Sequence, residues 1–256
     1  MRLVSLLLPA LASAAAASAT PPQPVTIVAH RGLAEGLPEN TLAAFRQSIA
    51  NGVSIIELDL RVTRDGQLVV LHDLTVDRTT GCSGAVAEMT FARVKACDAG
   101  RGERVPTFAE AVALVQGKPV RLLADVKDGT PIGPVLSAIR QFHAEHQVIL
   151  GLRSVKHVAR ARAVLPDTTI LGFMPAISDA PAFTNAGTDI LRLWSDWAEA
   201  DPALIGRMRA LGPQVWIVVG RRLPSNQAQW RALHGRMIAA GAQGLITDRP
   251  DLVPAP

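Results

Sequence analysis

The sequence has no tyrosine, and its 256 residues include only four tryptophans, six phenylalanines and two cysteines. So few aromatic residues argue against a protein that binds RNA by stacking its bases on aromatic rings. Charged residues make up 19% of the chain, the net charge is +4 and the arginines are spread along it, which favours a solvated surface over a nucleic-acid-binding patch. With 48% hydrophobic residues, the chain is too apolar to be disordered. We therefore expect a folded protein that does not bind nucleic acid.

Residues 1–19 have the features of a secretory signal peptide. A positively charged start precedes an apolar stretch from Leu3 to Ala17, and Ala17-Ser18-Ala19 is a small-residue cleavage site. A membrane anchor is the weaker alternative, because this stretch is shorter than the roughly 18–20 residues needed to span a bilayer. No later segment is long and apolar enough to serve as one. The sequence predicts cleavage after Ala19 and a periplasmic or secreted protein, residues 20–256, without a stable membrane anchor.

Export bears on the two cysteines, Cys82 and Cys97, which stand 15 residues apart. Disulfides persist in the periplasm and outside the cell, so a disulfide between them is favoured, with two buried free thiols as the alternative. Two cysteines are too few for a structural zinc site.

Short apolar runs alternate with amphipathic stretches along the chain, which predicts βα units and a parallel sheet. The strand-like runs are Val25–His30, Ile55–Arg61, Val120–Lys127, Gln147–Arg153, Thr168–Phe173, Asp189–Trp194, Gln214–Val219 and Gly244–Asp248. The helical candidates include Glu39–Asn51, Gly133–Ala144, Ser154–Val164, Pro202–Leu211 and Asn226–Ala240. Eight strands in about 230 residues indicate an α/β protein with a (β/α)8 TIM barrel, formed as a single domain by residues 20–256. The alternative is an open doubly wound sheet, but no Gly-x-Gly-x-x-Gly follows the first strand.

One further apolar run, Leu68–Asp73, follows the second strand too closely for a parallel crossover and predicts an extra antiparallel hairpin strand. Asp65-Gly66 is typical of a two-residue hairpin turn. A turn of that length would place Asp59 directly opposite His72, with Glu57 on the same face two residues earlier. The spacing thus predicts that these three side chains lie together.

A pair of close carboxylates such as Glu57 and Asp59 favours a cation between them, because like charges repel. Ligands that are all oxygen suit a hard cation, Mg²⁺ or Ca²⁺. Asp125 and Lys127 share a face at the end of the next barrel strand and add a third carboxylate and a positive charge. The alternatives are a solvated carboxylate pair and a simple Asp125–Lys127 ion pair inside the barrel.

His30 ends the first strand and Arg31 follows it. Two histidines beside a cation, His30 and His72, could supply one proton acceptor and one proton donor near neutral pH. The arginine adds a forked donor that suits phosphate oxygens. A purely structural role is the alternative for His30.

These residues belong to an ordered set of motifs that resembles the glycerophosphodiester phosphodiesterase family across nearly the whole chain after the signal peptide. The motifs are Ala29-His30-Arg31-Gly32, Pro38-Glu39-Asn40-Thr41, Glu57-Leu58-Asp59, Thr63-Arg64-Asp65-Gly66, Leu71-His72-Asp73, Asp77-Arg78-Thr79-Thr80, Val105-Pro106-Thr107-Phe108, Asp125-Val126-Lys127, Val215-Trp216-Ile217-Val218 and Gly244-Leu245-Ile246-Thr247-Asp248-Arg249-Pro250. Each motif alone is weak, whereas the ordered set is specific.

The resemblance implies a TIM barrel that hydrolyses glycerophosphodiesters, small molecules, with one bound divalent cation, and it assigns roles to individual residues. The implied roles are catalysis for His30 and His72, metal binding for Glu57, Asp59 and Asp125, substrate binding for Arg31, Lys127 and Trp216, and support behind them for Glu39 and Asn40, the latter as a helix cap. Core packing is the alternative for Trp216. The family usually has glutamate at the position of Asp125, while related phospholipase D-type toxins use aspartate, so this ligand is the one departure.

Two other functions compete with this one. A lysophospholipase D or sphingomyelinase D-type enzyme would need an apolar groove for an acyl chain, and the predicted loops are short. A barrel that binds glycerophosphodiesters without cleaving them would be expected to lack a ligand or a histidine, and every charged role is filled in this chain.

Overall fold

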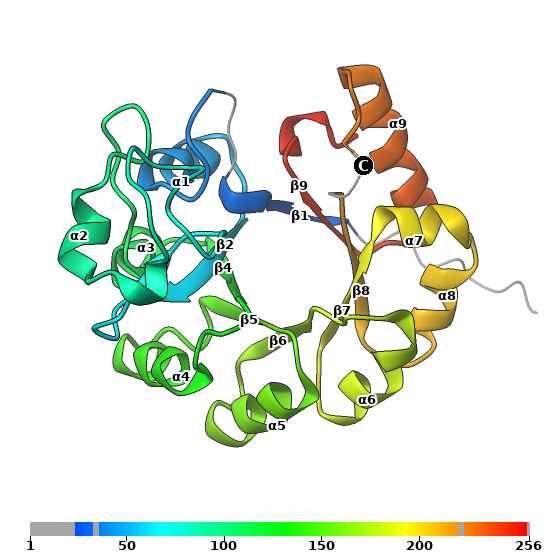
Figure 1. Cartoon of the computed structure of the whole chain (residues 1–256). Coiled ribbons are helices and arrows are strands. Elements are labelled where there is room, and N and C mark those ends of the chain that lie inside the picture. Colours follow the sequence, from blue (N-terminus) through cyan, green and yellow to red (C-terminus); the bar gives the residue numbers. More distant parts are fainter. Residues whose placement is uncertain (1–23, 33–35, 220–222, 255–256) are drawn as a thin grey trace, which may run out of the picture.

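Eight parallel strands form a closed barrel in the computed structural model, which describes residues 24–32, 36–219 and 223–254. The barrel strands are β1 (Thr26–Ala29), β2 (Ile55–Val62), β4 (Arg121–Val126), β5 (Val148–Leu152), β6 (Thr169–Gly172), β7 (Ile190–Trp194), β8 (Gln214–Val218) and β9 (Gly244–Thr247). The sheet closes because β1 pairs with both β2 and β9. Figure 1 shows the strands around a central axis with the helices outside them. The predicted TIM barrel is confirmed, and the predicted signal peptide lies outside the described residues.

The helices connect successive strands and cover the outside of the barrel. They are α1 (Leu42–Ala50), α2 (Phe91–Ala96), α3 (Phe108–Val115), α4 (Ile132–Gln141), α5 (Val155–Val164), α6 (Ala180–Asn185), α7 (Ser195–Ala200), α8 (Leu204–Arg209) and α9 (Gln227–Ala239), with short 3₁₀ turns at His30–Gly32, Val86–Glu88, Ile177–Asp179 and Pro250–Leu252. None of the helices in the described ranges is long and apolar enough to cross a membrane.

Alternation along the barrel strands separates two apolar layers. In β2, Leu58 and Leu60 pack outward in the core that the helices share, whereas Ile55 belongs to a smaller cluster inside the barrel. Because side chains alternate along a strand, Glu57 and Asp59 continue the inward-facing row beyond Ile55. The inner apolar cluster therefore forms the floor below the polar end of the barrel.

The extra hairpin strand is present as β3 (Leu68–Val70), but its predicted register is wrong by one residue. The ladder pairs Leu60 with Val70, so the loop contains three residues and ends at Gly66, whose φ is +84°. This is the three-residue hairpin with glycine in the left-handed region, rather than the two-residue turn. The Asp65 carboxylate stabilises it by accepting hydrogen bonds from the Thr63 hydroxyl (2.6 Å) and from the Phe91 amide (2.8 Å).

The shifted register changes what faces Asp59. The Leu71 amide donates to the Asp59 carbonyl oxygen (2.9 Å), so Leu71 and not His72 lies opposite Asp59. His72 follows the end of β3 and reaches the same end of the barrel through the connection that comes next in the chain.

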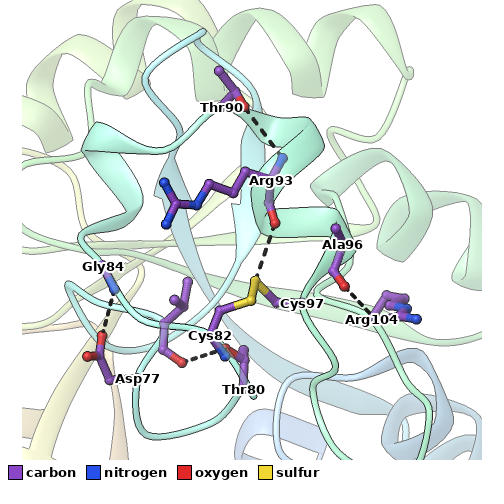
Figure 2. Close-up of a disulfide and its surroundings, with 10 residues drawn as sticks. Asp77, Thr80, Cys82, Gly84, Thr90, Arg93, Ala96, Cys97 and Arg104 are labelled. Atoms are coloured by element: carbon purple, nitrogen blue, oxygen red, sulfur yellow. Dashed lines mark hydrogen bonds between the residues drawn. A yellow bond between two sulfur atoms is a disulfide. The ribbon is translucent and has the colours of Figure 1, made fainter.

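That connection, residues 71–107, is called the insertion below. It carries α2 and has an apolar core of its own, which includes Val76, Val86 and Val94. A disulfide joins Cys82 in the loop before α2 to Cys97 at the end of that helix, as Figure 2 shows. The disulfide therefore ties together the segment that begins with His72.

Helix α9 is joined to the end of β9 through a buried histidine. His234 Nε2 lies 2.9 Å from the Thr247 hydroxyl, and its Nδ1 lies 3.2 Å from the Leu252 carbonyl oxygen. Burial lowers the pKa of His234, and the hydrogen bond to Leu252 and the charge of Asp251 only partly oppose it. This contact supports the turn that places Asp248 beside the first strand.

Candidate active site

A cavity of about 300 Å³ opens at the carboxyl ends of the barrel strands. Its walls combine charged and apolar side chains, namely His30, Arg31, Glu57, His72, Asp125, Lys127, Arg153, Phe173, Trp194, Val218 and Ile246. A larger cavity of about 570 Å³, near Pro24–Ile27 and Asn51–Ser54, contains neither of the predicted catalytic histidines. The smaller cavity is therefore the candidate active site, because the predicted catalytic histidines line it. It also lies where TIM-barrel enzymes have their active sites.

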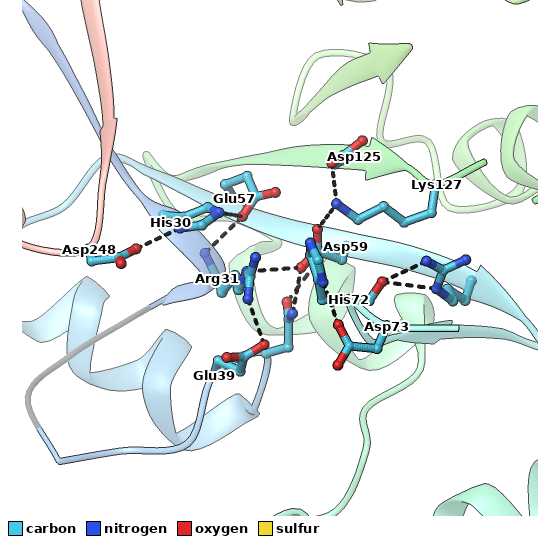
Figure 3. A network of polar contacts seen from close by, with 12 residues as sticks. His30, Arg31, Glu39, Glu57, Asp59, His72, Asp73, Asp125, Lys127 and Asp248 are labelled. Atoms are coloured by element: carbon cyan, nitrogen blue, oxygen red, sulfur yellow. Dashed lines mark hydrogen bonds and ion pairs between the residues drawn. The ribbon is translucent and has the colours of Figure 1, made fainter. Parts of the chain in front are cut away.

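Three buried carboxylates meet beside this cavity. Glu57 and Asp59 come from β2, and Asp125 comes from β4, where it is directly paired with Asp59 in the parallel ladder. One oxygen from each of the three lies within 4.8 Å of the others, and each residue is at most 2% exposed. Figure 3 shows Glu57 beside the His30 ring, and Asp59 and Asp125 beside the Lys127 ammonium.

The pKa values of Glu57 and Asp59 are shifted in opposite directions. Burial, together with the charge of Asp59, raises the pKa of Glu57 to about 8. The pKa of Asp59 is lowered although burial opposes this, because Lys127 and Arg31 lie close to it. Lys127 Nζ is 2.6 Å from Asp59 Oδ1 and 2.5 Å from Asp125 Oδ2. Lys127 thus pairs with both Asp59 and Asp125, whereas Glu57 Oε2 lies 4.0 Å from His30 Nε2.

This arrangement fits a divalent cation. The ligand atoms are all carboxylate oxygens, which hard cations such as Mg²⁺ and Ca²⁺ prefer. A cation near Glu57 would offset the burial and the repulsion by Asp59 that together raise the pKa of its carboxyl group. Glu57, Asp59 and Asp125 are the residues that could hold it.

Asp125 also has a partner that was not predicted from the sequence, Arg153. The Arg153 guanidinium donates to both of its oxygens, at 2.6 Å and 3.1 Å, from the end of β5. Arg153 also stacks over the Phe173 ring, 5.0 Å from its centroid. The ion pair with Lys127 that the sequence allowed is present, and it coexists with the carboxylate cluster.

His30 lies at the end of β1 and is held by an aspartate from the far end of the chain. Its Nδ1 lies 2.6 Å from Asp248 Oδ1, and its Nε2 lies 4.0 Å from Glu57 Oε2. Burial lowers the pKa of His30, but Glu57 and Asp248 outweigh it and the net shift is upward. Closure of the barrel between β9 and β1 brings Asp248 to this position.

His72 is held in a similar way. Its Nδ1 lies 2.7 Å from Asp73 Oδ1, and its carbonyl oxygen accepts two hydrogen bonds from the Arg61 guanidinium, at 3.0 Å and 2.7 Å. Burial lowers the pKa of His72. Each histidine therefore has one ring nitrogen bonded to an aspartate, and both rings line the cavity.

Arg31 lies in the turn after β1 with a φ of +54°. Its amide donates to Glu57 Oε2 (2.8 Å), its guanidinium donates to Glu39 Oε1 (2.9 Å), and its Nε is 3.5 Å from Asp59 Oδ2. The next residue is Gly32, where a Cβ would lie 2.2 Å from the Phe45 ring, so only glycine fits this turn.

Asn40 supports the cluster but does not cap a helix, so that prediction is wrong. The cap of α1 is Thr41, whose hydroxyl accepts a hydrogen bond from the Ala44 amide. The Asn40 side chain instead donates to Asp59 Oδ2 (2.7 Å) and accepts from the Asp59 amide (3.3 Å). A φ of +57° at Asn40 turns it toward β2.

Trp216 is not among the residues that line the cavity, and the substrate-binding role expected for it stays a prediction. It is 3% exposed and belongs to the apolar cluster inside the barrel, where a Cβ at Gly244 would lie 2.6 Å from its ring. Its indole nitrogen donates to Gln214 Oε1 (3.0 Å) at the start of β8. The structure shows Trp216 packed in the core, the alternative from the sequence, and Trp194 of β7 lines the cavity.

Comparisons with known proteins agree with this geometry. The sequence profile of the "Glycerophosphoryl diester phosphodiesterase family" matches residues 30–252. The "Glycerophosphodiester phosphodiesterase" of Caldanaerobacter subterraneus subsp. tengcongensis is 38% identical over 237 residues, which cover 88% of this chain and 94% of that protein.

Solved structures share the fold. A glycerophosphoryl diester phosphodiesterase from Parabacteroides distasonis superposes with a TM-score of 0.79 at 20% identity, covering 93% of this chain and 90% of that one. An Oleispira antarctica phosphodiesterase in complex with the product sn-glycerol-3-phosphate has a TM-score of 0.74 at 21% identity, covering 88% and 93% of the two chains.

Proposed function

The chain belongs to the glycerophosphoryl diester phosphodiesterase family, and on that basis we propose that it hydrolyses glycerophosphodiesters to glycerol phosphate and an alcohol by two-histidine acid–base catalysis. The observation that carries the proposal is the convergence of His30 and His72 on one cavity with three buried carboxylates. The product named for the Oleispira antarctica structure supports a small substrate of this class.

The charged residues divide the work of binding a phosphodiester. The Arg31 and Lys127 side chains line the cavity and supply positive charge for the phosphate oxygens. When bound, a divalent cation held by Glu57, Asp59 and Asp125 would neutralise negative charge on the phosphate. We propose that activity depends on such a cation, Mg²⁺ or Ca²⁺.

The histidines would move the protons. One accepts a proton from the attacking oxygen as its bond to phosphorus forms, and the other donates a proton to the ester oxygen as the bond to the alcohol breaks. The attacking group is water or the neighbouring glycerol hydroxyl, and in the second case water then opens the cyclic phosphate. Asp248 and Asp73 support this role, since each holds one ring nitrogen of a histidine and fixes the orientation of its ring.

We also propose that the protein is exported and that cleavage after Ala19 leaves one domain, residues 20–256. The signal-peptide features of residues 1–19 support export. The disulfide between Cys82 and Cys97 is consistent with an oxidising compartment. Amino-terminal sequencing of the protein recovered from the periplasm or medium tests this, and an uncleaved chain in the cytoplasm would refute it.

A product assay tests the proposed activity. Purified protein is incubated with glycerophosphocholine, glycerophosphoethanolamine, glycerophosphoglycerol and lysophosphatidylcholine, with and without EDTA, and glycerol phosphate and free alcohol are measured. We expect glycerol phosphate from the glycerophosphodiesters, loss of activity with EDTA and recovery with Mg²⁺ or Ca²⁺. Cleavage of the lysolipid alone would instead indicate a lysophospholipase D or sphingomyelinase D-type enzyme, and no cleavage of any substrate would indicate a binding protein.

A further inference from the structure

Arg78, in the insertion, bridges two carboxylates that each hold a residue of the proposed active site. Its guanidinium donates to Asp73 Oδ2 (2.6 Å) and Oδ1 (3.2 Å). The same guanidinium donates to Glu39 Oε2 (2.9 Å) and Oε1 (2.8 Å). Both carboxylates are thus bound bidentately by a single planar group, an arrangement that fixes direction as well as distance.

Each carboxylate also contacts a different residue of the proposed active site. Glu39 Oε1 also accepts from the Arg31 guanidinium, and Asp73 Oδ1 also bonds to His72 Nδ1. Figure 3 shows Glu39 beside Arg31 and Asp73 beside His72. Arg31 follows β1 and His72 lies near the start of the insertion, so Arg78 connects the segments that follow β1 and β3, two strands that each pair with β2.

Stability alone does not explain this bridge. The Arg78 side chain is 49% exposed, and an isolated ion pair at such exposure contributes little to stability. Hydrogen bonds from Arg78 hold the pKa of Asp73 at about 2, which keeps this carboxylate ionised at neutral pH. The bridge therefore fixes the geometry of charged groups at the edge of the cavity more than it holds the fold together.

We propose that Arg78 is a positioning residue for catalysis. By fixing Glu39 and Asp73 relative to each other, it sets where Arg31 meets the phosphate and where the His72 ring meets the reacting oxygen. The proposal rests on the function proposed above, because it concerns the same site.

The first test compares Arg78→Met and Arg78→Lys with a matched control. Arg236→Met removes another exposed arginine, 57% exposed, whose guanidinium lies 2.6 Å from Glu199 Oε1 on the outer helices. Steady-state kinetics on a glycerophosphodiester and thermal unfolding are measured for each variant. We expect Arg78→Met to lower kcat, raise KM and reduce kcat/KM by about 10–100-fold, the range seen when supporting contacts of an active site are removed.

The other variants separate a positioning role from a structural one. Arg78→Lys keeps the charge but lacks the fork, so it should recover only part of the loss, and Arg236→Met should stay within about twofold of wild type. A lower unfolding temperature in Arg78→Met with unchanged kcat and KM would overturn the proposal. If that variant does not fold, Arg78→Lys decides, and wild-type kinetic constants there would overturn it equally. Absence of turnover in the wild-type protein would refute the proposed function itself.

Two double-mutant cycles, which combine Arg78→Met with Asp73→Asn and with Glu39→Gln, give the second test. Asp73→Asn should act mainly on kcat through His72, and Glu39→Gln mainly on KM through Arg31. Adding Arg78→Met to Asp73→Asn should then lower kcat far less than it does in the wild type, because the contact is already lost. Effects that simply multiply in both cycles would show that Arg78 does not act through these carboxylates.

Discussion

Replacing Asp125 tests whether this aspartate is a metal ligand or only an ion-pair partner. Asp125→Asn removes a charge that accepts hydrogen bonds from Lys127 (2.5 Å) and from Arg153 (2.6 Å and 3.1 Å). Lys127 keeps its ion pair with Asp59, and Arg153, 27% exposed, can turn to water. We therefore expect to lose the equivalent of one charge-assisted hydrogen bond, about 2 kcal/mol of unfolding free energy. For a chain of this size that lowers the unfolding temperature by about 4–8 °C.

The effect on the metal separates the two roles. Removing residues that only support a metal ligand lowers metal affinity by about 10–100-fold, so losing a direct ligand should cost at least about tenfold. Activity in Asp125→Asn should therefore be low at limiting Mg²⁺ or Ca²⁺ and partly recover at high concentration. Asp125→Glu keeps the charge and introduces the residue usual in the family, so its apparent metal affinity should stay near that of the wild type.

The assay is a metal titration of activity for the wild type and both variants, with unfolding measured alongside. Asp189→Asn is the matched control, since Asp189 forms a 2.7 Å ion pair with Arg162 at the opposite end of the barrel. It should leave metal affinity unchanged. The same apparent metal affinity in wild type, Asp125→Asn and Asp125→Glu would remove Asp125 from the proposed ligand set and leave Glu57 and Asp59.

Three further predictions follow from other parts of the molecule. His30→Ala and His72→Ala should each lower kcat by about 10²–10⁴-fold with an unchanged circular dichroism spectrum, and near-native turnover would assign that histidine a structural role. Reduction of the Cys82–Cys97 disulfide, which closes a 15-residue separation, should lower the unfolding free energy by about 3 kcal/mol in urea titrations, whereas two alkylatable thiols in the unfolded, non-reduced exported protein would refute the bridge. Burial lowers the pKa of His234 below 6.5 in the folded state, so the unfolded state binds a proton more readily and the free energy of unfolding falls as the pH drops below 6.5. In urea titrations at pH 7.5 and 5.5, the loss of unfolding free energy at the lower pH should be smaller in His234→Gln than in the wild type. An equal loss in both proteins would refute this assignment.

The barrel was predictable because its signals are local. Strands buried on both faces appear as continuous apolar runs, and the predicted runs overlap all eight barrel strands. Alternation along β2 was equally informative, since it placed Glu57 and Asp59 on one face. Helix α3 could also have been predicted: Thr107 and Glu110 have the spacing of a capping box, and the structure has that box.

The turn sequence alone did not give the hairpin register. Asp65-Gly66 fits a two-residue loop, but the loop has three residues, and the Asp65 carboxylate in it accepts hydrogen bonds from the nearby Thr63 hydroxyl and from the amide of Phe91, 26 residues later. The predicted proximity of His72 to the carboxylates was right for a different reason. His72 reaches the cavity because the insertion places it there after β3 has ended. The pairing of β2 with β3 does not place it opposite Asp59.

The alternation of side chains along a strand does not predict how deep inside the barrel an inward-facing residue lies. Trp216 and Val218 share the inward face of β8, yet only Val218 lines the cavity while Trp216 packs below it against Gly244. A period of two identifies the face but not the layer, and the layer depends on strand tilt and on which neighbours are small. The position of a residue relative to the strand end is more informative: Arg153 and Asp248 each directly follow a strand, and the site of a parallel barrel is built at those ends. Applied to every strand rather than to the first three, this rule would have identified both residues from the sequence, because closure of the barrel brings the ends of β5 and β9 to the same cavity.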